Sequence, residues 1–244
     1  MDKDSRRRVL GTLGAGALGA GLTAASSIPG AGAKVTNVPN AFIGKHEPVP
    51  LPFNARKLDG LSDKLITSHW QNNYVGSVKA LNMIESKLAL AMADQQIPPL
   101  VYNGLKREEL HRTGSVILHE IYFGSLGGNG KSGGDILRAL TDSFGSFDDW
   151  RAEFIRISGG LGGGSGWVVL SINLHTMSLH NYWSADHMHN ATNSFPLLAL
   201  DMYEHSYHMD YGTAARRYVD AFMANTNWEV VDQRYQRALR MAAA

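Results

Sequence analysis

The stretch DMYEHSY, residues 201–207, follows an apolar run that we expect to form a strand, and it leads into a helical turn. Asp201 and His205 lie four residues apart in it, so a carboxylate oxygen and an imidazole nitrogen can face one point. Such a pair suits a metal ion, although an Asp and a His at this spacing also occur by accident in helices. The stretch therefore predicts a strand-to-helix junction and a candidate metal site.

Two further histidines lie on predicted helices that can bring them to the same point. Apolar residues at helical spacing predict one helix from residue 61 to about 93 and another from 103 to about 123. If these helices pair antiparallel, His69 of the first and His119 of the second can meet. Three His and one Asp suit iron or manganese and would also accept zinc. A single His in a helix is more often a surface or core residue than a ligand, so spacing alone leaves both interpretations open.

Composition narrows the classes of protein. The chain has 244 residues, 44% of them hydrophobic, which is enough for a buried core. Its 23 Lys and Arg nearly balance 22 Asp and Glu, so we expect no nucleic acid among its partners. It contains no Cys, which excludes disulfides, thiolate metal ligands and thiol nucleophiles. The glycine-rich stretch GGLGGGSG, residues 159–166, matches no phosphate-binding loop.

Residues 1–33 have the pattern of an export signal. Arg6 to Arg8 precede a Gly/Ala/Leu run that ends in Ala-Gly-Ala at residues 31–33. Paired arginines before such a run are typical of twin-arginine signals. A membrane anchor is the alternative, but the run is short and rich in glycine. We therefore expect the twin-arginine export machinery as a partner, a periplasmic location, and no membrane segment after the signal is removed.

The rest of the chain divides at a glycine-rich linker, residues 124–134. We expect a proline-containing arm and a helical hairpin domain in residues 34–126, and a second domain in residues 127–244. The elements expected in the second domain are two short helices (135–143, 147–158), three strands (167–174, 177–185, 197–202) and a terminal helical region (213–238) broken near 225–227. The sequence thus predicts an α+β fold of two parts.

Four other histidines lie in or beside the expected strand hairpin: His175, His180, His187 and His189. We expect them to be solvated or loop residues, with metal binding at the surface as a minor alternative.

Several motifs, taken in chain order, resemble those of the iron/manganese superoxide dismutases. Residues 201–207 are similar to that family's signature Asp-x-Trp-Glu-His-Ala-Tyr. The other matching motifs are LPF (51–53), DSFGSF (142–147), GSGW (164–167) and NWEVV followed by RY (227–235). His69 and His119 fall at the family's first two ligand positions. The resemblance covers nearly all of the chain after residue 33.

The resemblance implies a helical hairpin followed by an α/β domain with a three-stranded antiparallel sheet. One Fe or Mn ion would lie between them, held by His69, His119, Asp201 and His205, with a solvent molecule as fifth ligand. The implied reaction converts superoxide, the small-molecule substrate, to dioxygen and hydrogen peroxide while the metal alternates between its +3 and +2 states. The resemblance also implies a homodimer, in which Glu204 reaches toward the last histidine ligand of the other subunit.

The residues around the implied metal depart from the family pattern. Positions that differ are Ser115 and Gly163, where a Gln beside the bound solvent is expected, Asn73 and Ser77, where the gateway has His and Tyr, and Tyr203 and His208, where the family has Trp and Tyr. Trp167 of the GSGW motif is kept. The expected ligands are thus present, whereas the residues that deliver protons and tune the metal differ.

Two functions remain open on the sequence. The first is an exported superoxide dismutase with altered surroundings of the metal. The second is a metal-binding homologue with weak or no dismutase activity, serving as a metal carrier or another redox protein. In either case, we expect the place of the missing Gln to be taken by a polar side chain from another segment, by a water held by Ser115, or by Tyr203.

Overall fold

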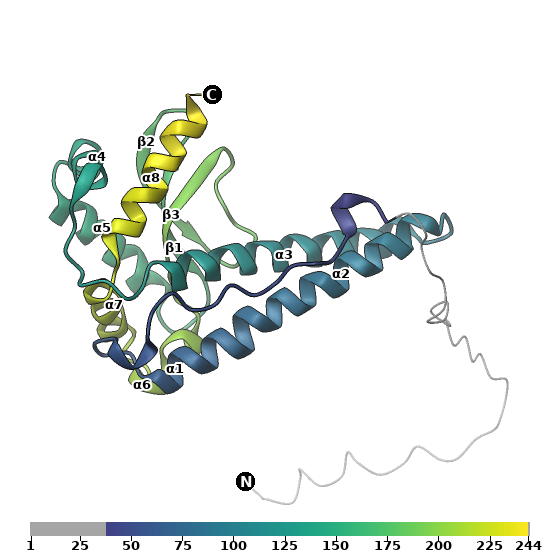
Figure 1. Ribbon diagram of the computed structural model, residues 1–244, viewed down its shortest axis with the longest axis horizontal. Helices are drawn as coiled ribbons and strands as arrows, with labels where there is room; N and C mark the ends of the chain where they lie inside the picture. Colours follow the sequence, from purple (N-terminus) through teal and green to yellow (C-terminus); the bar gives the residue numbers. More distant parts are fainter. Residues whose placement is uncertain (1–37, 244) are drawn as a thin grey trace, which may run out of the picture. The chain divides into compact units, whose positions relative to one another are not determined.

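A computed structural model describes residues 38–243, and the predicted signal lies outside these residues. Its first long elements are two helices, α2 (Val75–Ala93) and α3 (Pro99–Gly124), which form a hairpin (Figure 1). Helix α3 begins four residues earlier than expected, because Pro99 lies in the first turn, where its missing N–H costs nothing.

The helix expected over 61–93 is interrupted. It consists of α1 (Asp63–Ser68), a π-helical turn η3 (His69–Tyr74), and then α2. Ser62 caps α1, its hydroxyl accepting from the Leu65 N–H at 3.0 Å. The π-helical turn is wider than an α-helical one and changes the direction of the residues within it, and such turns are frequent at functional sites. His69 is the first residue of this turn.

The arm before α1 lies along the helical hairpin (Figure 1). It has two short 3-10 turns, η1 (Asn40–Phe42) and η2 (Ala55–Lys57). His46 Nε2 lies 2.7 Å from Glu85 Oε1 of α2, and the Val49 N–H donates to Tyr74 Oη at 2.8 Å. These contacts attach the arm to α2 and to η3.

Three antiparallel strands form a sheet in the order β2-β1-β3: β1 (Trp167–Asn173), β2 (Ser178–Ser184) and β3 (Ser194–Asp201). This confirms the predicted α+β fold with a three-stranded antiparallel sheet. Strand β3 begins three residues earlier than expected. Pro196 lies within it because β3 is an edge strand, and the pairing with β1 shifts register beside that proline.

The remaining helices follow the linker and the sheet: α4 (Gly134–Phe144), α5 (Phe147–Leu161), the short η4 (Glu204–Ser206) and α6 (His208–Tyr211), α7 (Ala215–Ala224) and α8 (Trp228–Ala242). Helices α4, α5 and α8 pack against the sheet, and α3 packs against β3. The break expected near 225–227 is confirmed, with Asn227 capping α8 through the Val230 N–H. Among the described residues, no helix is both long and apolar enough to cross a membrane.

Candidate metal centre

Four residues from four separate elements converge at the inner end of the hairpin and the sheet. His69 comes from η3, His119 from α3, Asp201 from the last position of β3 and His205 from η4. One ligand atom of each lies within 4.8 Å of the others. The structure therefore brings together all four of the residues that the sequence predicts as ligands.

The atoms around Asp201 have the spacing of ligands that share one ion. Its Oδ2 lies 3.1 Å from His69 Nε2, 3.2 Å from His205 Nε2 and 3.6 Å from His119 Nε2. Donor atoms bound to one ion at about 2.1 Å are separated by roughly 3 to 3.6 Å. His119 Nε2 is buried and has no hydrogen-bond partner among the described residues. A buried imidazole nitrogen without a partner is costly, and a metal ion would satisfy it.

Asp201 is fixed from three directions. Its Oδ1 accepts from the Tyr203 N–H at 2.9 Å, and its carbonyl oxygen accepts from Tyr218 Oη and from Ser206 Oγ, both at 2.8 Å. Burial alone would raise the pKa of Asp201, but the neighbouring His205 and His69 outweigh burial and lower that pKa. The carboxylate is therefore ionised and ready to bind a cation.

The buried histidines are held neutral, with a lone pair free. Burial lowers the pKa of His119 to about 3 and also lowers the pKa of His69, despite the nearby Asp201. His119 Nδ1 lies 2.7 Å from the Ser115 carbonyl oxygen. Because a carbonyl oxygen only accepts, Nδ1 carries the proton and Nε2 is left to bind. Metal ligation by histidine needs this form.

Aromatic rings form the walls of the site. Phe123 lies 4.9 Å from the His69 ring, and the buried Trp167 lies 5.2 Å from the His119 ring, measured between centroids. Tyr203 stacks on His205 at 5.3 Å. Burial and then Asp201 raise the pKa of Tyr203 to about 12, so its hydroxyl keeps its proton.

His187 lies in the loop between β2 and β3, as expected of a loop residue, but it is not solvated. His187 is only 7% exposed, and its ring stacks on the ring of Tyr203, with 4.9 Å between the centroids. Trp167 Nε1 lies 3.0 Å from His187 Nδ1. An indole N–H only donates, so Nδ1 accepts and a neutral His187 carries its proton on Nε2. Burial lowers the pKa of His187 to about 4, which keeps it neutral at pH 7.

His187 lines one cavity together with two of the expected ligands. This cavity has a volume of about 300 Å³ and reaches His119 and His205 from the surface. Its other lining residues are Asn72, Asn73, Gly76, Ser77, Arg112 and Ser115. Asn73 and Ser77, at the positions expected to form the gateway, thus both line this cavity. Ser77 Oγ and Ser115 Oγ are hydrogen-bonded at 2.8 Å.

The other predicted site residues lie apart from this cavity. Gly163 lines a different cavity, beside Met202 and Ala215, and its N–H donates to Tyr207 Oη at 3.0 Å. A Cβ built at Gly163 would meet open space. Glu204 and His208 are both exposed. Of the polar residues that could replace the missing Gln, His187 is the one that enters from another segment, the loop between β2 and β3.

Sequence reasoning missed His187 because no periodicity marks a buried residue in a nine-residue loop. One signal was present: Gly114 lies in the middle of α3, where glycine costs about 1 kcal/mol relative to alanine. A glycine inside a helix is one sign that another segment approaches closely. The segment that approaches Gly114 is this loop, at His187.

Comparison with known proteins agrees with this geometry. A family model for the C-terminal domain of iron/manganese superoxide dismutases matches residues 132–234. An iron superoxide dismutase of Cupriavidus metallidurans is 51% identical over 196 residues, 80% of this chain and 98% of that protein. One of Aquifex pyrophilus is 32% identical over 76% of this chain and 89% of that protein. A manganese superoxide dismutase of Halobacterium salinarum is 31% identical over 80% of this chain and 98% of that protein.

Proposed function

The chain belongs to the iron/manganese superoxide dismutase family, and we propose that it is an exported dismutase. In this enzyme His187 would take the place of the missing Gln. His69, His119, Asp201 and His205 would hold one Fe or Mn ion, and the 51% identity to an iron enzyme favours iron. The observation that carries this proposal is the convergence of three imidazole Nε2 atoms on one buried carboxylate oxygen. Superoxide decay that scales with bound metal is its test.

When bound, the ion supplies a redox centre that alternates between +3 and +2, so that one superoxide is oxidised to dioxygen and the next is reduced to hydrogen peroxide. The chain's own residues hold the ion and orient its ligands. Asp201 supplies the negative charge; the Tyr203 N–H donates to its carboxylate, and Tyr218 Oη donates to its backbone carbonyl oxygen. Ser115 fixes the His119 tautomer. Such outer contacts of ligands typically change metal affinity or activity 10- to 100-fold.

Formation of hydrogen peroxide consumes two protons, which must reach the site. His187 carries a proton on Nε2 and lines the cavity that leads to His119 and His205. A solvent molecule in that cavity can accept a hydrogen bond from Nε2–H. We assign to His187 the task of orienting this solvent, which is the task of the absent Gln. Three of the four ligands are buried, which suits a resident ion, and the relatives are dismutases, so the metal-carrier alternative is not favoured.

Arg112 gives a prediction about substrate capture. It is the only residue lining the cavity, within the described part of the chain, that bears a permanent charge, and superoxide is an anion. We expect Arg112→Gln to lower the second-order rate constant about threefold at low ionic strength, because a cation at the mouth speeds encounter with an anion. The difference should shrink in salt, which screens the charge.

The control is Arg107→Gln, which removes an exposed positive charge of the same helix outside the lining of the cavity. Stopped-flow rates of the wild-type protein and the two variants, at two salt concentrations, test whether Arg112 guides superoxide to the cavity. Equal rates for the Arg112 and Arg107 variants at low salt would refute a guiding role for Arg112.

Glu204 gives a prediction about assembly. It directly precedes His205 and is exposed in the single chain, so its carboxylate can contact a second subunit. We expect a homodimer at micromolar concentration and a weaker dimer in Glu204→Ala. Light scattering of both proteins, with the exposed Glu47→Ala as control, provides the measurement. A monomeric wild-type protein would count against the proposed dimer.

The signal gives a prediction about location. We expect the full chain to be exported by the twin-arginine machinery and Arg6→Lys/Arg7→Lys to remain in the cytoplasm, since this route recognises the paired arginines. Fractionation of cells producing each protein, followed by immunoblotting, measures the distribution. Periplasmic wild-type protein in a host lacking this machinery would contradict the assigned route.

A further inference from the structure

Gly114 lies where the loop between β2 and β3 comes closest to α3. A Cβ atom at this position would lie 1.8 Å from the backbone carbonyl oxygen of His187 and 2.9 Å from its carbonyl carbon. Contacts below 3.0 Å do not occur at real Cβ atoms. Any side chain here therefore forces the loop and the helix apart by at least about 1.2 Å.

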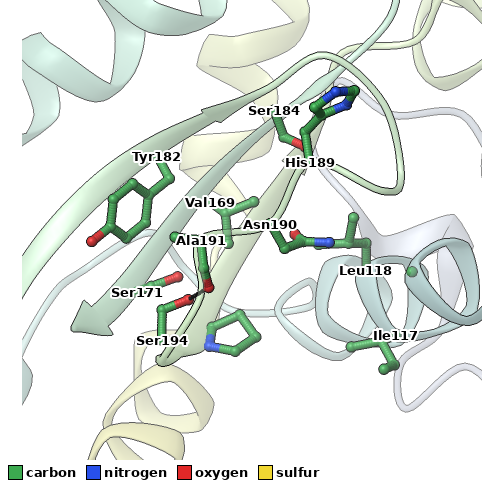
Figure 2. A pocket seen from close by; sticks show the side chains of 12 residues that line it. Ile117, Leu118, Val169, Ser171, Tyr182, Ser184, His189, Asn190, Ala191 and Ser194 are labelled. Carbon is green, nitrogen blue, oxygen red and sulfur yellow. Dashed lines mark hydrogen bonds between the residues drawn. The ribbon is translucent and has the colours of Figure 1, made fainter. Parts of the chain in front are cut away.

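The same carbonyl oxygen also accepts a hydrogen bond from a side chain of the loop. Asn190 Nδ2 donates to the His187 carbonyl oxygen at 3.1 Å. Figure 2 shows Asn190 extending from the loop toward Leu118 of α3, beside a cavity of about 210 Å³ that Gly114 also lines. We call Gly114 and Asn190 the seat of His187. The cavity beside the seat gives the loop room to shift when the seat is changed.

The position of this carbonyl fixes the position of the ring. His187 accepts from Trp167 Nε1 at 3.0 Å, stacks on Tyr203, and lies edge-on to His111 at 4.8 Å between centroids. A hydrogen bond at 3.0 Å is lost when its acceptor moves by more than about half an ångström. A shift of the main chain by about 1.2 Å is therefore enough to release the ring from Trp167.

We propose that Gly114 is a positioning residue of the enzyme: its missing side chain lets the loop close on α3 and places His187 at the metal centre. This inference rests on the proposed function for its catalytic consequence, but not for its geometry. Displacement of a group that orients a reacting molecule by about 1 Å costs up to 100-fold in rate. Helix α3 has another glycine, Gly104, at which an added Cβ would meet open space, and this makes it a matched control.

The first experiment needs no metal. The indole N–H resonance of Trp167, recorded in the metal-free full chain, reports the hydrogen bond to His187. We expect this resonance to shift in Gly114→Ala to the position that it has in His187→Ala, and to stay unchanged in Gly104→Ala. An unchanged resonance in folded Gly114→Ala overturns the proposal.

The second experiment separates positioning from stability. Activity per bound metal should fall at least about 10-fold in Gly114→Ala, but less than about 2-fold when Gly114→Ala is added to His187→Ala. A purely structural role of Gly114 predicts the same loss in both backgrounds, and that result also overturns the proposal. Urea unfolding in both backgrounds records the loss of stability itself.

If Gly114→Ala does not fold, Asn190→Ala tests the same seat without a clash. A shifted Trp167 resonance supports the proposal, and an unchanged one overturns it. Wild-type protein without dismutase activity would end the proposed function, but the Trp167 resonance would still decide whether Gly114 positions His187.

Discussion

His205→Ala is expected to bind iron or manganese at least about 100-fold more weakly than the wild-type protein, because a ligand contributes more than the 10- to 100-fold of an outer contact. His205 is the most exposed of the four converging residues, with 28% of its side chain exposed, so its truncation leaves the core intact. Metal content after dialysis, measured by elemental analysis, gives the result. Thermal stability should fall with the metal, since an ion that binds only the folded state stabilises it.

The matched control is His208→Ala, which removes an exposed histidine three residues further on. This variant should keep its metal and its melting temperature. A full metal complement in His205→Ala would show that the assigned ligand set is wrong.

His187→Ala is expected to keep its metal and to lose about 10- to 100-fold of its activity per metal, as outer contacts typically do. It should also unfold more easily by about 1 to 3 kcal/mol, because the Trp167 indole N–H loses its buried acceptor. His187→Gln should recover part of both, since an amide offers an acceptor for Trp167 and a donor for solvent. Stopped-flow superoxide decay and urea unfolding measure the two effects.

The control for this prediction is His189→Ala, in the same loop but with 58% of its side chain exposed. We expect wild-type activity per metal from it. If His187→Ala also retains wild-type activity per metal, another group orients the solvent, and Ser115 becomes the candidate.

Local pattern predicted most of the elements of this fold. Helical periodicity located the hairpin and the broken terminal helix. The features that it missed depend on tertiary structure. Periodicity gave no sign of the π-helical turn that starts at His69. It also placed the start of β3 too late, because Pro196 is tolerated only on an edge strand.

The residues of the candidate site were likewise predicted only in part. The sequence motifs predicted the four converging residues, which the structure brings together. The side chain that we propose as the replacement for the missing Gln could not be found at positions 115 and 163, because it lies in a loop whose path depends on tertiary packing. The backbone of His187 comes so close to α3 that only a glycine fits at position 114. A glycine in a helix and a histidine in a loop, 73 residues apart, form a pair that neither pattern reveals alone.

We expect this chain to catalyse superoxide dismutation at a metal held by His69, His119, Asp201 and His205. The most direct test is stopped-flow superoxide decay with purified protein of known metal content, in the presence of a chelator that removes free ions. We expect decay that is first order in protein, proportional to bound iron or manganese, and lost in His205→Ala. Decay no faster than that of the chelated buffer, from protein carrying one metal per chain, would contradict it.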